Sequence, residues 1–172
     1  MPKENDRDRF KRMATDRVNR FKQVCLAVSN LADTRYHYTK EEVLWYMNQV
    51  KVRVDEVKKE FFNPKLKRST IVIEEIPQMA VVQWSNSEDV ANAKFHELMP
   101  KRLNRLVSIL NLLLNLTNKS HYRYMNGDVK QMFAYINRAL DVTQSHFVGI
   151  DDFKFVLQGE ESEDDGIARP KR

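Results

Sequence analysis

The sequence of 172 residues has little glycine and little proline, and this scarcity excludes several kinds of protein. It contains four glycines, all after residue 126, and five prolines. Phosphate-binding loops, such as the Walker loop and the dinucleotide-binding fingerprint, need glycines at fixed positions, which argues against such a loop in the first 126 residues. The same scarcity favours long helices over a turn-rich β fold.

A single cysteine and the lack of long apolar runs limit the chain further. Cys25 has no partner for a disulfide and cannot form a cysteine-based zinc site. Its position on an apolar helical face predicts a small buried thiol. No stretch reaches the ~18–20 apolar residues of a membrane span, and the charged N-terminus lacks the apolar segment of a secretory signal. We therefore expect a soluble, cytoplasmic protein with no membrane partner.

Charge is distributed unevenly between the body of the chain and its C-terminal end. Of the 29 basic and 24 acidic residues, three basic and five acidic ones lie in 159–172, which leaves 26 and 19 in the body, a net charge of +7. The composition of 159–172 predicts a disordered acidic tail. A basic body admits a polyanionic partner, although a solvated surface also accounts for it.

The chain contains one pattern of residues twice. At an offset of 85 residues, Phe10 matches Phe95, and the run 17–20 (Arg-Val-Asn-Arg) matches 102–105 (Arg-Leu-Asn-Arg). After one inserted residue, at an offset of 86, the run 36–38 (Tyr-His-Tyr) matches 122–124 (Tyr-Arg-Tyr). We infer an internal duplication, with repeats at about 10–62 and 95–147.

Apolar spacing within each copy predicts two amphipathic helices. The second helix of each copy carries a stripe with 4-3-4-3-4 spacing. Its members are Val43, Met47, Val50, Val54, Val57 and Phe61 in the first copy, and Val129, Phe133, Ile136, Leu140, Thr143 and Phe147 in the second. Thr39 and Glu42 form a capping box ahead of the first of these stripes. Each copy is therefore predicted to be an αα-hairpin.

Shorter elements are expected around the hairpins. β-branched and aromatic residues predict short strands near 70–83 and 153–157, which can pair into a small sheet. Ser85 and Glu88 predict a short helix that ends near Met99, before Pro100, and the repeat predicts another at 6–14. The expected fold is mainly α: a pseudo-twofold helical bundle of two duplicated αα-hairpins with a minor β element, in a single domain at 1–158.

The helix predicted at 103–116 is apolar around most of its circumference. Such a helix is either central to the bundle or buried by a partner, and a homodimer through this helix is one expectation. Its polar stripe is uncharged and consists of Asn104, Ser108, Asn111 and Asn115. The stripe predicts either a hydrogen-bonded seam between helices or a face for an uncharged polar surface of a partner.

The sequence offers little for catalysis. The four histidines show no metal-ligand spacing, and no nucleophile elbow is present. The adjacent acids at 41–42 and 74–75 indicate helix-start and strand-edge charges rather than an acid–base pair. We therefore expect no enzymatic activity, no cofactor and no metal.

Two repeated groups of polar residues are the candidate binding sites: arginines at i,i+3 in the first helix of each copy, and basic residues among tyrosines in each hairpin link. Basic groups can bind phosphates while tyrosine rings stack on bases. Alternatively, the tyrosines pack over helix ends, and the arginines pair with Asp16, Asp55 or Asp141. The candidate nucleic-acid-binding residues are Arg17, Arg20, Arg35, Tyr36, Tyr38, Arg102, Arg105, Lys119, Tyr122, Arg123 and Tyr124.

These features favour a non-catalytic accessory protein that binds nucleic acid, DNA or RNA, through a basic, tyrosine-containing surface presented twice. The alternative is a protein-binding adaptor or inhibitor, of the kind that phages and plasmids encode, which docks on a larger nucleic-acid-processing complex. The apolar helix at 103–116 and the acidic tail, which repels a polyanion, favour this alternative.

Overall fold

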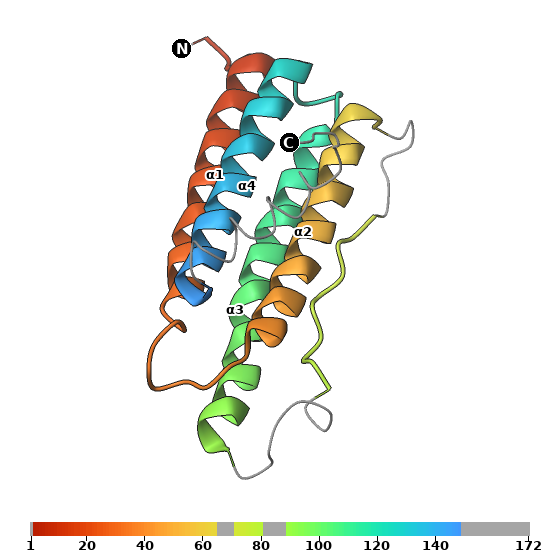
Figure 1. Ribbon diagram of the computed structural model, residues 1–172. Coiled ribbons are helices and arrows are strands. Elements are labelled where there is room, and N and C mark those ends of the chain that lie inside the picture. The colour runs from red at the N-terminus through yellow and green to blue at the C-terminus, as the bar shows by residue number, and fades with distance from the viewer. Residues whose placement is uncertain (1, 65–70, 81–88, 149–172) are drawn as a thin grey trace, which may run out of the picture.

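The computed structural model describes residues 2–64, 71–80 and 89–148, which form a four-helix bundle (Figure 1). The helices are α1 (Asp6–Ser29), α2 (Lys40–Phe62), α3 (Val90–Leu114) and α4 (Asn126–Phe147), and a 3-10 turn, η2 (Asn115–Thr117), follows α3. The mainly α class is confirmed. The described part of the chain contains no β-strand: 71–80 has no strand partner, and the strand expected at 153–157 lies outside it.

Side-chain caps start three of the helices. The predicted capping box is present: Glu42 N donates to Thr39 Oγ1 at 3.1 Å, and Thr39 N donates to Glu42 Oε1 at 2.7 Å. Asn5 caps α1 in a similar way by accepting from Asp8 N at 2.7 Å. Asp89 caps α3, so the described helix starts at Val90. The second predicted capping box, at 85–88, lies outside the described residues.

The two short leading helices are the first turns of longer ones, and the predicted break at Pro100 is wrong. α1 is continuous from Asp6, and α3 runs through Pro100 without ending. A proline inside a helix costs about 3 kcal/mol, because its ring removes a backbone hydrogen bond. Met99 and Leu103, on either side, are fully buried in one core. Burial of each such side chain stabilises the fold by about 1.5–3 kcal/mol, which outweighs the proline.

The two helices of each predicted hairpin lie diagonally opposite each other instead of side by side. α1 packs against α3 and α4, and α2 packs against the same two helices. In Figure 1, α1 and α4 run in one direction, and α2 and α3 run in the opposite direction. The two helices of each predicted αα-hairpin therefore do not pack against each other: each half buries its apolar stripes against the other half.

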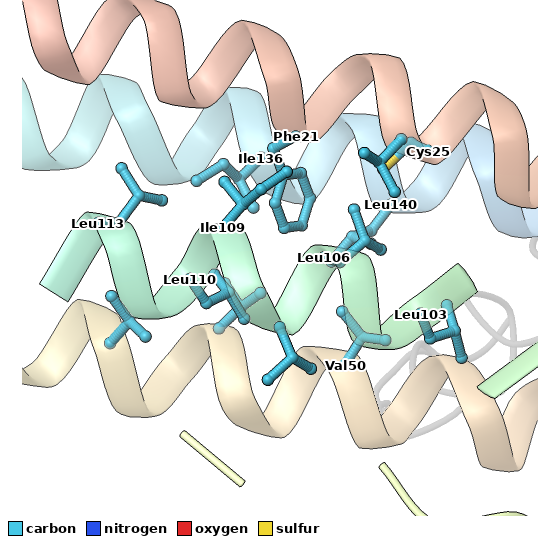
Figure 2. Close-up of a cluster of buried hydrophobic side chains, with 14 of the residues drawn as sticks. Phe21, Cys25, Val50, Leu103, Leu106, Ile109, Leu110, Leu113, Ile136 and Leu140 are labelled. Carbon is cyan, nitrogen blue, oxygen red and sulfur yellow. The ribbon is translucent and has the colours of Figure 1, made fainter. Parts of the chain in front are cut away.

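The core is built from the apolar stripes that the sequence predicts (Figure 2). Every member of the α2 stripe is buried, and so is every member of the α4 stripe except Phe147, which is half-buried. Figure 2 shows side chains of the helices pointing into the space between them. Cys25 is 3% exposed, as expected for a buried thiol. Burial raises the pKa of this thiol to about 11.

Candidate functional site

Two of the four arginines that match at the 85-residue offset connect α1 to α3. Arg17 Nη1 donates to Leu112 O at 2.5 Å, and Arg102 Nη1 donates to Ala27 O at 2.7 Å. Both acceptors lie in the last turn of a helix, where the helix dipole attracts positive charge. Each guanidinium therefore caps the end of the neighbouring helix. Partial burial lowers the pKa of Arg17, without removing its charge at neutral pH.

The other two of these four arginines face solvent. Arg20 and Arg105 follow Arg17 and Arg102 by three residues, which places them on the same side of each helix. Both are exposed, and no ion pair among the described residues involves either of them. Of the acids expected to pair with the arginines, Asp141 lies 3.6 Å from Lys51 instead.

Reciprocal hydrogen bonds fix how α1 and α3 lie beside each other. Arg17 is level with Leu112, and Arg102 is level with Ala27. The two arginines are therefore separated by about ten residues of helix, or ~15 Å along the bundle. Arg20 and Arg105 lie between them. The structure thus brings these four arginines onto one face, here called the arginine seam (Arg17, Arg20, Arg102 and Arg105).

In the first link, residues 30–39, the tyrosines pack onto the bundle. The Tyr38 ring lies 5.1 Å from Phe95 and 5.3 Å from Phe147 between ring centroids, and burial raises its pKa. Tyr36 is half-buried against the core. Arg35 is exposed, lies 5.6 Å from the centroid of the Tyr36 ring, and pairs with an aspartate two residues earlier. Of the three candidate residues in this link, only Arg35 is exposed.

The second link, residues 115–125, has the corresponding arrangement. The Tyr124 ring lies 5.3 Å from both Phe10 and Phe61, and its hydroxyl donates to Phe61 O at 2.7 Å. Lys119 Nζ lies 5.4 Å from the centroid of the Tyr124 ring. The structure therefore shows the packing alternative for this tyrosine: its ring covers a helix end, and its hydroxyl satisfies a carbonyl in the last turn.

The two links lie at opposite ends of the bundle (Figure 1). α2, which runs from one end to the other, has 23 residues and is about 35 Å long. Lys119, half-buried Tyr122 and exposed Arg123 border a shallow hollow at one end, whereas Arg35 lies at the other. The structure does not bring the links together, and the arginine seam lies between them.

Segment 71–80, here called the strap, lies along the groove between α2 and α3. Asn111 Oδ1 accepts from Ile73 N at 2.7 Å, and its Nδ2 donates to Ile73 O at 3.1 Å. Asn104 forms the same pair of bonds with Ile76, at 2.6 and 3.0 Å. The amide stripe therefore meets backbone of its own chain, and neither a helix–helix seam nor a partner's surface is needed to explain these two amides.

Apolar side chains of the strap point into the bundle at every third position. Its buried residues are Ile73, Ile76 and Met79, each at most 4% exposed. Tyr46 Oη accepts from the Met79 N–H at 3.1 Å. Arg53 donates to the carbonyls of Glu74 and Glu75 at 2.7 and 3.1 Å. Side chains, rather than another strand, satisfy this extended backbone, which is why the predicted small sheet is not seen in the described residues.

Sequence reasoning missed a buried polar cluster between α2 and α3. Glu42 Oε2 bonds to His96 Nε2, and both side chains are 0% exposed. Tyr46 Oη bonds to His96 Nδ1 at 2.8 Å, and Asn92 Nδ2 donates to Glu42 Oε1 at 3.2 Å. The capping role of Glu42 gave no sign of these bonds, which form only when the helices meet. The cluster lies in the interior of the bundle.

The groove between α1 and α4 is open in the described chain. Two neighbouring hollows run along it and share Tyr135 as a lining residue. Leu26, Tyr135 and Val142 line the first hollow with 56%, 41% and 48% of their surface exposed. Lys22 and Arg138 also border this hollow. The groove thus combines exposed apolar surface with positive charge.

Metal-binding and membrane-spanning features are absent from the part of the chain that the structure describes. No three His, Cys, Asp or Glu side chains there are grouped to hold a metal ion. None of its helices combines the length and the apolar character that crossing a membrane requires. Comparisons of the chain with protein-family models, curated proteins and solved structures gave no match.

Proposed function

We propose that this chain is a non-catalytic nucleic-acid-binding protein built from two copies of one two-helix unit, with the arginine seam at the centre of its interface. The observation that carries the proposal is the pair Arg20 and Arg105, one from each half. Both are exposed on one face and have no carboxylate partner among the described residues. Such guanidinium groups are suited to phosphate oxygens.

Contacts that recur at the repeat offset support the duplication. Arg102 lies 85 residues after Arg17, and Leu112 lies 85 residues after Ala27. The two helix-capping bonds of the seam are therefore the same bond made twice, with the halves exchanged. A pseudo-twofold axis between α1 and α3 accounts for this exchange.

Ring clusters at the two links exchange in the same way. In each, a link tyrosine from one half packs against two phenylalanines from the other half. The clusters correspond at offsets of 85 and 86, and consist of Tyr124 with Phe10 and Phe61, and of Tyr38 with Phe95 and Phe147. Equivalent residues thus make equivalent contacts at both ends of the bundle.

A nucleic acid lying along the seam can meet basic groups over most of the bundle's length. The seam is central, with Arg35 beyond one end and Lys119 and Arg123 beyond the other. These ends are separated by about 35 Å, close to the ~34–36 Å of one duplex turn. Because the link tyrosines are partly buried, the contacts would be to phosphates, and binding would depend little on sequence.

The protein-docking alternative drew its main support from the helix at 103–116. The strap engages Asn104 and Asn111 of its amide stripe. Among the large apolar side chains of α3, only Val90, in the first turn, is exposed. The geometry therefore gives more support to nucleic acid than to a protein docked on α3.

Fluorescence anisotropy with labelled 20-nucleotide single strands and 20-base-pair duplexes tests the proposal. We expect a dissociation constant of about 1–100 μM at physiological salt, with tighter binding at low salt and steeply weaker binding as salt increases. The double variant Arg20→Ala/Arg105→Ala should bind more weakly, and the slope of log K against log salt for the duplex should fall by about 2.

Lys59→Ala/Lys130→Ala is the matched control, because it removes two exposed charges from α2 and α4, outside the seam. It should lower affinity less than the seam variant. No complex at about 100 μM protein and low salt would refute the proposal. Equal losses in the two double variants would show that the seam is not the interface.

A further inference from the structure

The open α1–α4 groove corresponds, under the proposed duplication, to the groove that the strap covers. α1 is the counterpart of α3, and α4 is the counterpart of α2. Figure 1 shows that α1 runs parallel to α4 and that α2 runs parallel to α3. The strap fills the α2–α3 groove, whereas the α1–α4 groove exposes Leu26, Tyr135 and Val142. In the described chain, one of two equivalent grooves is thus covered.

Residues that hold the strap have counterparts that line the open groove. The strap-holding residues are Tyr46, Arg53, Asn104 and Asn111. At offsets of 86 for the first two and 85 for the last two, their counterparts are Met132, Ala139, Asn19 and Leu26, all of which line the two hollows. Asn19 keeps an amide that can pair with backbone, and the other three counterparts are apolar.

The sequence after α4 repeats the pattern of the strap. Residues 73–79 read Ile-Glu-Glu-Ile-Pro-Gln-Met, with the buried side chains first, fourth and seventh. Residues 150–156 read Ile-Asp-Asp-Phe-Lys-Phe-Val, with apolar side chains at the same three places and two acids after the first. We propose that residues 150–156, which lie outside the described part, bind the α1–α4 groove of their own chain as a second strap.

Helix spacing in the open groove matches this segment. Asn104 and Asn111 are seven residues apart, a rise of about 10.5 Å, and they hold strap residues three apart, which span about 10 Å when extended. Asn19 and Leu26 have the same seven-residue separation. Two residues three apart in an extended segment can therefore meet both positions.

Chain direction is also the same in the two halves. The strap follows α2 and runs antiparallel to α2 and α3 (Figure 1). A chain that leaves Phe147 and turns back runs antiparallel to α4 and α1, past the hollow at Leu26 first. This register places Ile150 at Leu26, Phe153 at Asn19 and Val156 near the counterpart of Tyr46.

Charge and polarity of the groove suit this occupant. Lys22 and Arg138 border the first hollow, where Asp151 and Asp152 would lie. Ile150 and Phe153 would cover exposed apolar side chains that water otherwise contacts. The segment also needs no second molecule, because it starts three residues after the end of α4.

Cysteine cross-linking in the full-length chain tests the register. In a Cys25→Ala background, Asn19→Cys is combined in turn with one cysteine at each position from 150 to 157, and disulfides formed under mild oxidation are mapped by mass spectrometry. We expect the highest yield at 153, and a shift of the maximum to 150 when Leu26→Cys replaces Asn19→Cys. The pair Asn104→Cys and Ile76→Cys serves as a reference for the disulfide yield, because these two residues are in contact in the structure.

Three outcomes would overturn the inference. The first is an equal disulfide yield at all positions from 150 to 157. The second is a yield no higher than that obtained with a cysteine at Lys59 on α2. The third is a disulfide that joins two chains, which would assign the groove to a second copy. The experiment contains no nucleic acid, so its failure is distinguishable from failure of the proposed binding function.

Native Cys25 gives a second readout that needs no engineered thiol, because it lines the first hollow. We expect Ile150→Glu/Phe153→Glu/Val156→Glu to raise the alkylation rate of Cys25 by about tenfold, while the far-ultraviolet circular dichroism stays unchanged. The control Lys154→Glu/Gln158→Glu adds acidic groups outside the three apolar positions. It should leave the alkylation rate of Cys25 near that of the unaltered chain. Equal rates in all three proteins would overturn the inference.

Discussion

Replacing Asn104 with alanine should detach the middle of the strap and destabilise the bundle. The side chain makes two hydrogen bonds to Ile76, through Oδ1 at 2.6 Å and Nδ2 at 3.0 Å. A hydrogen bond contributes about 0.5–1.5 kcal/mol net, so loss of both predicts about 1–3 kcal/mol. Alanine has a higher helix propensity than asparagine, which offsets about 0.5 kcal/mol of this loss.

Equilibrium urea unfolding, followed by circular dichroism, measures this change in the free energy of unfolding. Ser108→Ala is the matched control, since Ser108 is exposed on the same stripe and its hydroxyl bonds to the carbonyl of Asn104 within its own helix. The control should stay within about 0.5 kcal/mol of the unaltered protein. If Asn104→Ala also stays within that range, the side chain does not hold the strap, and the reasoning is refuted.

Three further predictions concern the ends and the core of the bundle. Cys25, with its pKa raised to about 11, should react with iodoacetamide at pH 8 at least ~100-fold more slowly in the folded protein than in urea, measured by mass spectrometry; equal rates would contradict its burial. Tyr124→Phe should cost about 1 kcal/mol in urea unfolding through the lost bond to Phe61 O, and Tyr38→Phe should cost less, because the Tyr38 hydroxyl has no hydrogen-bond partner among the described residues; the reverse order would refute this reading. The Arg7 hydrogen bond lowers the pKa of Asp128, so the ion pair stabilises the fold above the unfolded-state value of about 4 and is lost as pH falls through the lowered folded pKa. The stability gap between the unaltered protein and Asp128→Asn should therefore be larger at pH 7 than at pH 2, and a gap that does not change would contradict the ion-pair account.

Helix positions were predictable because each helix carries its own signals. The capping box at Thr39 marked the start of α2, and the 4-3-4 spacing from Val43 to Phe61 marked its buried face. Such spacing depends only on the helical repeat, so it holds whatever the helix packs against. The spacing therefore indicates which face of a helix is buried, but not which segment covers that face.

Interactions formed between distant segments could not be read in the same way. The stripe of Asn104 and Asn111 was predicted to face another helix or a partner's surface, yet both amides bond to an extended segment that lies 28 and 38 residues earlier in the chain. Pro100 signalled a helix end, but burial of its neighbours decided otherwise. Neither outcome follows from local spacing, because both depend on which segments meet in three dimensions.

The candidate interface was predictable as a set of residues but not as a surface. The repeat identified all four seam arginines, and only the packing of α1 against α3 shows that they share one face. The same packing separates their roles: Arg17 and Arg102 bond to carbonyls, while Arg20 and Arg105 face solvent. The match at the 85-residue offset alone did not distinguish the roles of these arginines.

Arginine side-chain signals in a nuclear magnetic resonance titration test the central claim most directly. The Nε–Hε resonances of the full-length protein are followed as a 20-base-pair duplex is added at low salt. We predict that Arg20 and Arg105 shift together and saturate, while Arg17 and Arg102, bonded to Leu112 O and Ala27 O, shift much less. Unchanged Arg20 and Arg105 signals at saturating duplex, with the main shifts elsewhere on the bundle, would contradict the account.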